Sequence, residues 1–235
     1  EERIVLLQYT SGSTCNPRGV MISHRALSAN VQWVSSQYLG NKTNLVSVTW
    51  VPFYHDYGLT SILNCLYTGG KMVYMSPMEF LKDPLQWLHV MTKEKATHTQ
   101  APNFAYALCA RRARLFPHKA EGIDLRSVRQ FSMGGETIRK DTIEAFTTTF
   151  SVTAAQMDPS YGLAECVCGI VHFQDPHHTH AMAVNCFGQD VVTVGKIGNH
   201  VEIDILPDER FRVGGELLVH GKTMMSGYYK KNPNE

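Results

Sequence analysis

The stretch LQYTSGSTCNPRGV, Leu7–Val20, decides how the rest of the chain is read. An apolar run stops there in five small residues, Thr10-Ser11-Gly12-Ser13-Thr14, and a bend with Pro17 and Gly19 holds one cation, Arg18. Hydroxyls and freed backbone N–H groups in a glycine-containing loop form a concave site for anions. A guanidinium adds charge-assisted donors that match phosphate oxygens. The stretch therefore predicts a strand followed by a phosphate-binding loop.

Two other interpretations of this stretch have to be weighed. Clusters of Ser, Thr and Gly mark ordinary turns, so from the residues alone a plain turn is as good an account as a phosphate site. A Walker-type loop needs a lysine and a hydroxyl after its second glycine. Here Arg18 precedes Gly19 and Val20 follows it, which disfavours a P-loop NTPase.

The composition bounds the class of protein. The chain has 235 residues, 43% hydrophobic and 18% charged, which is enough to bury a core in one large domain or two small ones. The net charge of +1 favours neither nucleic acid nor a membrane surface as a partner. We find no apolar stretch of about 18 residues, so no transmembrane helix is predicted. The first residues, Glu1-Glu2-Arg3, do not form a signal peptide.

The cysteines allow two interpretations. Six of them, at positions 15, 65, 109, 166, 168 and 186, lie in apolar or small-residue runs without the spacing of a secreted disulfide scaffold. Reduced thiols in a cytoplasmic protein are the simpler interpretation. The alternative is zinc, because Cys166-x-Cys168 on a strand would place both thiols on one face, ahead of His172, His177, His178, His180 and Cys186. Structural zinc sites usually pair C-x₂₋₄-C with H-x₃₋₅-H, which this stretch does not match.

Strands and helices alternate along the first two thirds of the chain. Strands are predicted at 4–9, 45–50, 71–75, 97–100 and 128–133, and helices at 23–38, 58–68, 83–91, 102–114 and 138–150. This order predicts an α/β architecture of layered, mostly parallel sheets with helices. After about residue 170, Val201, Ile203 and Ile205 alternate with acidic residues, which predicts a small antiparallel β unit. We place a boundary there, between an α/β part at 1–170 and a β-rich part at 171–235.

Further motifs follow the opening stretch in a fixed order. They are WVPFYHDYGL (50–59), APNFAYALCARR (101–112), GGE (134–136), PSYGLAE (159–165) and GELLVHG…GYY (215–229). With YTSGST…P-R-G-V, they resemble the signatures of the acyl-adenylate-forming, or AMP-binding, enzymes, and most closely the fatty acyl-AMP ligases. The resemblance covers essentially the whole chain, and five motifs in order are specific where one would be weak.

The resemblance implies the central part of the large N-terminal domain of such a ligase. Residues 1–170 would hold the nucleotide- and acyl-binding subdomains, and 171–235 a third subdomain with a ligase-type insertion at about 172–194. The implied reaction joins a fatty acid to the α-phosphate of ATP with Mg²⁺ and expels pyrophosphate. The acyl group would then pass to the thiol of an acyl carrier protein or of a polyketide or peptide synthase domain, as in polyketide or lipopeptide biosynthesis.

The resemblance also assigns roles to the residues that carry charge. The β- and γ-phosphates would be held by Thr10, Ser11, Gly12, Ser13 and Thr14, with Arg18 adding charge. The family usually has glycine where Cys15 stands and lysine where Arg18 stands, which we do not read as a loss of activity. His55 would lie beside the acyl-adenylate junction and Glu165 would hold Mg²⁺, a hard cation that prefers oxygen. The plainer readings are a core histidine and a solvent-facing glutamate.

The nucleotide and acyl pockets are assigned in the same way. The nucleotide would lie against Gly134, Gly135, Glu136, Ser160, Tyr161 and Gly162. The acyl chain would lie against Tyr57, Gly58, Ile62, Asn103, Phe104 and Met133, although apolar residues of this kind are more often plain core. The assignment requires the hydroxyl-rich loop and Glu165 to face each other across one triphosphate.

Two alternatives remain open. One is an acyl-CoA ligase, which shares the first half-reaction and uses CoA as the acceptor. The other is a non-catalytic module that binds an acyl group or a nucleotide as a scaffold. The family's ribose-binding aspartate, in T-G-D, and its lid lysine are expected beyond Tyr229, so we do not expect this segment to catalyse adenylation alone.

Overall fold

The computed structural model of the chain describes residues 1–10, 17–39, 44–172, 183–186, 189–208 and 215–230. Its elements run β1 (Ile4–Tyr9), β2 (Gly19–Ser23), α1 (His24–Leu39), β3 (Val46–Thr49), α2 (Asp56–Thr68), β4 (Lys71–Tyr74), α3 (Pro77–Lys82), α4 (Leu85–Glu94), β5 (His98–Ala101), α5 (Asn103–Leu115), η1 (Pro117–Ala120), β6 (Gln130–Met133), α6 (Lys140–Phe150), η2 (Ala154–Gln156), β7 (Met157–Gly162), η3 (Ala164–Cys166), β8 (Gly169–His172), β9 (Ala183–Cys186), β10 (Gln189–Val192), β11 (Lys196–Ile197), β12 (Val201–Pro207) and β13 (Gly215–Gly221).

A seven-stranded sheet organises the fold, in the order β11-β8-β7-β6-β5-β3-β4. The five strands from β4 to β7 are parallel, and β8 and β11 add antiparallel strands at one edge. Parallel neighbours need crossover connections, and helices supply them here. The α/β class with a mostly parallel sheet, predicted from the alternation of elements, is confirmed.

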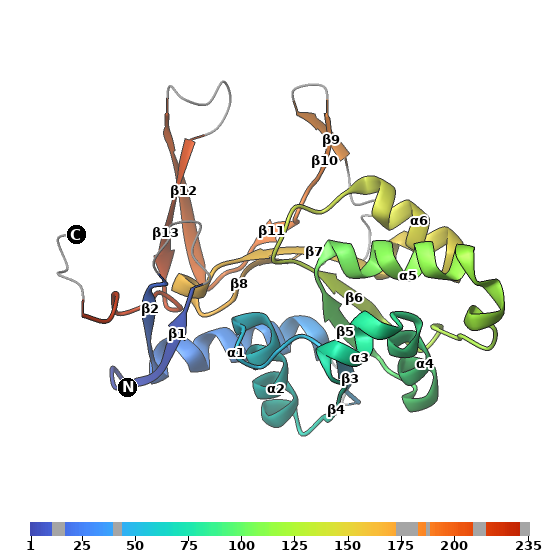
Figure 1. Ribbon diagram of the computed structural model, residues 1–235. Coiled ribbons are helices and arrows are strands. Elements are labelled where there is room, and N and C mark those ends of the chain that lie inside the picture. The colour runs from blue at the N-terminus through green and yellow to red at the C-terminus, as the bar shows by residue number, and fades with distance from the viewer. Residues whose placement is uncertain (11–16, 40–43, 173–182, 187–188, 209–214, 231–235) are drawn as a thin grey trace.

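Helices cover both faces of the sheet. Figure 1 shows α1 and α2 on one side of the parallel strands and α4, α5 and α6 on the other. The largest core lies on the second side, where Trp87 from α4, Tyr106 from α5 and Phe146 from α6 are fully buried with Phe131 of β6. Their rings meet mostly edge to face, the arrangement that aromatic quadrupoles favour. The sheet is therefore fixed mainly by its packing against α4–α6.

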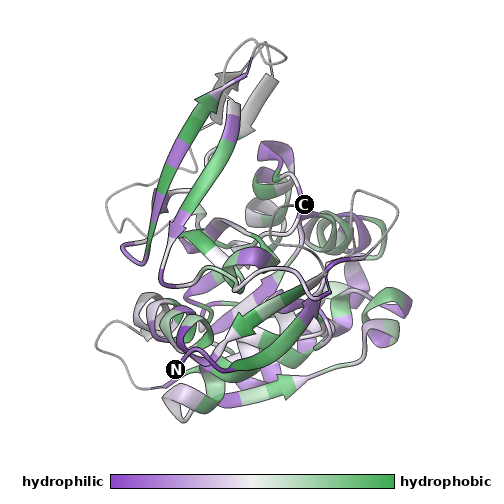
Figure 2. Cartoon of the chain, turned by 90° about the vertical axis from the view of Figure 1, so that its left-hand side faces the viewer, coloured by the Kyte–Doolittle hydropathy of each residue, from purple (hydrophilic) through white to green (hydrophobic). Residues whose placement is uncertain are grey.

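Two small antiparallel sheets, β1–β2 and β12–β13, lie near the end where the chain begins. β1 pairs antiparallel with β2, and β12 pairs antiparallel with β13, as the alternation at 201–205 predicts. Figure 1 shows the β12–β13 hairpin standing away from the central sheet, and Figure 2 shows apolar and polar residues alternating along it. Val20 and Ile22 of β2 are buried with Ala164 and Val167 in a second, smaller core. This core ties the β1–β2 hairpin to the corner that contains Glu165.

Two features of the structure differ from the elements considered in the sequence. The six-residue helix α3 was not predicted, although Ser76 and Glu79 form a capping box at its start. Cys166-x-Cys168 is not on a strand: the first thiol ends η3, and Val167 has a φ of 71°. The shared strand face that the zinc alternative would need is therefore not formed. The buried Cys166 Sγ lies 3.2 Å from Met224 Sδ instead.

The predicted boundary near residue 170 falls inside β8, a strand of the central sheet. The division into subdomains therefore stays a prediction. Of the insertion expected at about 172–194, the structure describes β9 and β10, which form an antiparallel hairpin, while 173–182 and 187–188 lie outside the described residues. In the parts of the chain that are described, no helix combines the length and apolar character needed to cross a membrane.

Candidate active site

A cavity of about 490 Å³ lies at the carboxyl ends of the parallel strands. It is lined by Gln8, Tyr9, Thr10, Pro17, Val34, Tyr54, His55, Asp56, Tyr57, Thr60, Gly134, Gly135, Ser160, Tyr161, Gly162, Ala164, Glu165, Cys168 and Gly169. Open α/β sheets bind their ligands at this edge, and the volume is typical of a small-molecule site. The cavity brings together residues from four of the motifs found in the sequence.

The floor of the cavity is built where β6 and β7 end. A Cβ at Gly134 would lie 2.9 Å from Ser160 Oγ, so the glycine lets the ends of the two strands pack closely. Gly135 has a φ of +81°, a left-handed conformation that glycine adopts without strain. Ser160 Oγ donates to the carbonyl of Met133 at 2.9 Å, which joins the two strand ends. A flat ring can therefore approach the backbone closely at this point.

Tyr57 forms the wall between the cavity and the sheet. Its hydroxyl donates to Ser132 Oγ at 2.9 Å, and its carbonyl accepts a hydrogen bond from Gln100 Nε2. Burial raises the pKa of the Tyr57 hydroxyl, so it stays a neutral donor. The side chain of Tyr57 is therefore held at its hydroxyl and its main chain at the carbonyl, which gives this side of the cavity a fixed shape.

His55 occupies the position before α2, with its side chain half-exposed. Its Nδ1 lies 2.7 Å from Asp56 Oδ1 and 3.2 Å from the Tyr57 amide nitrogen. The two contacts require opposite states of Nδ1, and we assign the ion pair because it is shorter. Asp56 Oδ1 also accepts the Tyr57 N–H at 2.6 Å, so the amide already has a partner. The hydrogen bond to Asp56 raises the pKa of His55, against the lowering effect of desolvation.

Glu165 lies in η3 and lines the same cavity. Its Oε1 accepts a hydrogen bond from the Tyr228 hydroxyl at 2.7 Å, and its carbonyl accepts one from the Met225 N–H at 2.8 Å. A carboxylate has a second oxygen, which leaves Oε2 as a donor atom for a cation. Mg²⁺ is usually bound by one or two carboxylates together with substrate phosphates. The donor set around Glu165 fits that arrangement.

The hydroxyl-rich loop joins β1 to β2. Ser11, Gly12, Ser13 and Thr14 lie outside the described residues, so the structure leaves their predicted role untested. The loop is closed at its base, where the Thr10 N–H donates to the Arg18 carbonyl at 3.0 Å. Thr10 and Pro17, which flank the loop, line the same cavity as Glu165. Arg18 is exposed and does not line it, but its guanidinium lies 5.2 Å from the centre of the Tyr228 ring.

Several predicted site residues lie away from the cavity lining. Glu136 Oε1 accepts the Phe104 N–H at 2.7 Å, and Asn103 Oδ1 accepts the Arg139 N–H at 3.0 Å, so both hold the start of α5 and its surroundings. Met133 is fully buried in the main core. Gly58 and Ile62 lie in α2 but do not line the cavity. The nucleotide role of Glu136 and the acyl-pocket roles of the others stay predictions.

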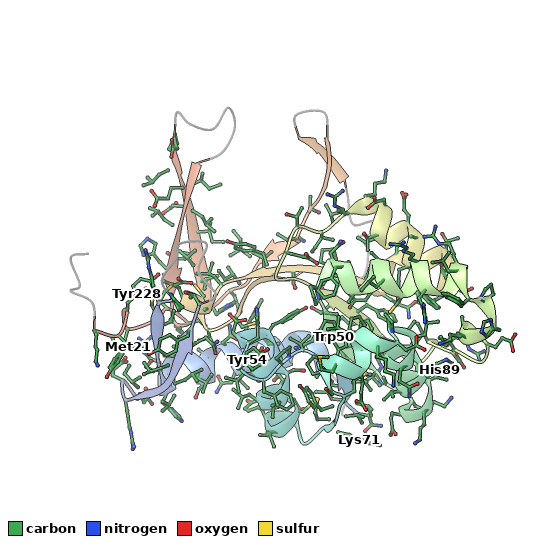
Figure 3. All side chains as sticks on the ribbon, in the orientation of Figure 1. Met21, Trp50, Tyr54, Lys71, His89 and Tyr228 are labelled. Carbon is green, nitrogen blue, oxygen red and sulfur yellow. The ribbon has the colours of Figure 1, made fainter. Side chains whose placement is uncertain are left out.

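Other lining residues were not predicted from the sequence. Tyr54 is 83% exposed at the cavity, and its carbonyl accepts a hydrogen bond from Gln8 Nε2 at 2.9 Å (Figure 3). Cys168 lines the cavity beside Thr60, and burial raises the pKa of its thiol. Tyr228, which binds Glu165, is also new. Tyr54 and Tyr228 stand inside quoted motifs, but their contacts are made 46 and 63 residues away in the chain.

The zinc alternative finds no support among the described residues, where no three His, Cys, Asp or Glu side chains are grouped to hold a metal. Of the histidines considered for it, His177, His178 and His180 lie outside the described residues. A magnesium site at Glu165 that is completed by phosphate oxygens of a ligand does not need three protein side chains.

Comparisons with known proteins agree on one family. The sequence model described as "AMP-binding enzyme" matches residues 1–229. The chain is 39% identical over 168 residues to the medium-chain-fatty-acid–[acyl-carrier-protein] ligase JamA of Moorena producens, covering 70% of this chain and 28% of JamA. It is 36% identical over 196 residues to the 4-hydroxyphenylalkanoate adenylyltransferase of Mycobacterium tuberculosis, covering 81% of this chain and 31% of that protein.

Solved structures give the same result. The fatty acyl-adenylate ligase from L. pneumophila, in complex with acyl adenylate and pyrophosphate, superimposes with a TM-score of 0.83 at 32% identity. That match covers 99% of this chain and 44% of the ligase. The chain therefore spans less than half the length of the proteins it matches.

Proposed function

Because the chain belongs to the AMP-binding enzyme family, we propose that the gene product containing it activates a fatty acid as an acyl-adenylate. In this reaction a carboxylate oxygen of the acid attacks the α-phosphorus of ATP, the bond to the bridging oxygen breaks, and pyrophosphate leaves. The observation that carries the proposal is the cavity itself. Thr10, His55, Gly134, Ser160 and Glu165 come from four separated motifs and line one space.

Both reactants are anions, so the site has to offset charge and hold the attacking oxygen in line. In our proposal Thr10 and residues 11–14 bind the β- and γ-phosphates, and Arg18 adds charge at the mouth. The adenine lies against Gly134, Gly135 and Tyr161. The open space beside Gly135 supports this placement, because a Cβ there would meet none of the described atoms within 4 Å and a flat ring can approach the backbone.

His55 is proposed to donate a hydrogen bond to the charge that develops at the reacting carboxylate and phosphate. When Nδ1 is bound to Asp56, Nε2 is a donor only in the protonated ring. The raised pKa of His55 supports the role, because it increases the protonated fraction near neutral pH. Proposed Mg²⁺ would be held by Glu165 and by phosphate oxygens of ATP, and it would offset their negative charge.

The acyl chain is proposed to lie along Tyr57, Gly58, Ile62, Asn103, Phe104 and Met133. Phe104 is 39% exposed, and its ring centre lies 5.9 Å from that of the buried Trp50. An exposed aromatic face that is backed by other rings is a suitable surface for a hydrocarbon chain. This observation supports an acyl pocket at Phe104, and the experiment below measures which chain lengths it accepts.

We propose an acyl carrier protein, alone or as a domain of a polyketide or peptide synthase, as the acceptor of the acyl group. The proposal is supported by the similarity to JamA, which is named as a ligase for such a carrier. The insertion at about 172–194 is proposed to restrain the C-terminal lid of such ligases, and so to disfavour transfer of the acyl group to CoA. The described cysteines 65, 109, 166 and 168 are free thiols, which supports the cytoplasm as the compartment.

The test measures pyrophosphate release by the full-length gene product with ATP, Mg²⁺ and saturated fatty acids of graded length. We expect release that depends on the acid, with the acyl-adenylate detected by mass spectrometry. The product is then offered a holo-carrier protein or CoA, and a thioester with CoA alone would make the protein an acyl-CoA ligase. No release with any acid would overturn the proposal in favour of a scaffold module.

A further inference from the structure

Tyr228 lies where three separate stretches of the chain meet. Its hydroxyl donates to Glu165 Oε1 at 2.7 Å, and the Arg18 guanidinium carbon lies 5.2 Å from the centre of its ring. Its backbone forms an isolated antiparallel bridge with Val20, and Figure 3 shows Tyr228 beside β2. One side chain thus contacts both the cation at the base of the hydroxyl-rich loop and the carboxylate of Glu165.

The backbone around Tyr228 is fixed on both sides. The Tyr229 N–H donates to the Gly19 carbonyl at 2.7 Å, and the Met21 N–H donates to the Gly227 carbonyl at 2.9 Å. One turn earlier, the Met225 N–H donates to the Glu165 carbonyl at 2.8 Å. The segment 225–229 therefore runs along β2 and is anchored to the corner of η3. A hydroxyl held in this way has little freedom to leave the carboxylate.

We propose that Tyr228 is a positioning residue that sets Glu165 and Arg18 for the magnesium–triphosphate part of ATP. The inference rests on the function proposed above. The hydrogen bond to Oε1 fixes the plane of the carboxylate and leaves Oε2 for the cation, while the ring face restrains Arg18 through a cation–π contact. Groups that orient a metal ligand typically change metal affinity by about 10–100-fold.

The test compares Tyr228→Phe with Tyr229→Phe in the full-length gene product. Both changes remove one hydroxyl. Tyr229 is a suitable control because it is 44% exposed and its ring makes a cation–π contact with the Lys230 ammonium. ATP affinity is measured by calorimetry with Mg²⁺ and with EDTA, and the unfolding temperature is measured without ligand. For Tyr228→Phe we expect the gain in affinity from Mg²⁺ to fall about tenfold. Affinity in EDTA and the unfolding temperature stay at wild-type values, as do all measurements for Tyr229→Phe.

Equal losses of affinity with Mg²⁺ and with EDTA would overturn the inference, because the effect would not pass through Glu165. An unchanged or tighter Mg²⁺-dependent affinity would overturn it as well. A second measurement repeats Tyr228→Phe in a Glu165→Ala background, where we expect no further loss. Pyrophosphate release by the wild-type protein distinguishes a failure of the proposed function from a failure of this inference. If release is absent, the proposed function fails; if release is normal and Tyr228→Phe is silent, only this inference fails.

Discussion

Glu165 illustrates how far the role of a residue depends on contacts outside its own motif. The motif PSYGLAE places the glutamate after β7, but its carboxylate is held by Tyr228, 63 residues later. Its main-chain carbonyl is held by Met225 from the same segment. The residue is therefore fixed at one side-chain oxygen and at its main-chain carbonyl before any ligand binds, and preorganisation of this kind is what a cation site requires.

Glu165→Ala is expected to lower the rate of pyrophosphate release by at least about 100-fold. Partners that only orient a metal ligand are worth about 10–100-fold, and the ligand itself should be worth more. Release is measured at saturating fatty acid over a range of Mg²⁺ concentrations. Glu202→Ala, at an exposed position on β12, is the control and should keep the wild-type rate. A Glu165→Ala protein with near-normal turnover would contradict the role of this residue.

The His55–Asp56 pair predicts a pH effect with a defined sign. The pair raises the pKa of His55 above the ordinary value of about 6.5. Its contribution to stability is therefore complete below about pH 6.5 and is lost as the pH rises through the raised pKa. The contribution should be less than about 1 kcal/mol, because the His55 side chain is half-exposed.

The measurement is an NMR titration of His55, combined with urea unfolding at both ends of this pH range. In Asp56→Asn the pKa of His55 should return toward about 6.5, while the Asn oxygen can still accept the Tyr57 N–H. In the same variant, the small loss of stability that the wild-type protein shows at high pH should be absent. A His55 pKa that Asp56→Asn leaves unchanged would show that the pair is not formed.

At the scale of elements, the start of α2 is closely packed against the turn that precedes it. A Cβ at Gly58 would lie 2.2 Å from the Pro52 carbonyl oxygen and 2.7 Å from that of Val51. The turn before α2 can therefore close only over a glycine, and this turn carries His55 into the cavity. The helix ends at Gly69, whose φ of 65° is the left-handed conformation of a C-cap.

Gly58→Ala is expected to destabilise the protein by about 3 kcal/mol, because backbone atoms rather than flexible side chains fill the space. Gly69→Ala meets no atom within 4 Å and should cost only about 1 kcal/mol for the left-handed φ. Urea unfolding of the two variants gives the comparison. Equal losses would show that the turn at Pro52 can move to admit a methyl group.

The elements also show where prediction from the sequence succeeds and where it stops. The strand at 4–9 has the bounds that were predicted, because an apolar run is a local signal. The expectation that it is buried is wrong: Ile4, Val5, Leu7 and Tyr9 are exposed on this two-stranded sheet. The helix α3 was missed, since six residues are too few to show a helical period, although its capping box is visible in the sequence. The zinc alternative assumed a strand through Cys166 and Cys168, and a positive φ at Val167 rules that strand out.

At the scale of the whole molecule, stability should be concentrated on one side of the sheet. Phe146 is fully buried, with ring centres of Tyr106 and Phe131 at 5.1 and 5.4 Å. Phe146→Ala is expected to cost about 3–5 kcal/mol. Leu206→Ala, on the projecting β12 where the side chain is 48% exposed, should cost less than about 0.5 kcal/mol. Urea unfolding followed by tryptophan fluorescence measures both, and similar losses would contradict this distribution.

The sequence by itself determined the class of fold, most of the strands and helices of residues 1–150, and the motifs whose residues line the cavity. These follow from local signals, namely apolar periodicity, glycines, and small polar motifs with fixed spacing. Only the tertiary structure decided which of those residues meet. Parallel strands carry the ends of β3, β6 and β7 to one edge, so Tyr57, Gly134 and Ser160 become neighbours. The contact between Tyr228 and Glu165 could not be predicted, because a hydrogen bond across 63 residues depends on the path of the chain and not on any local pattern.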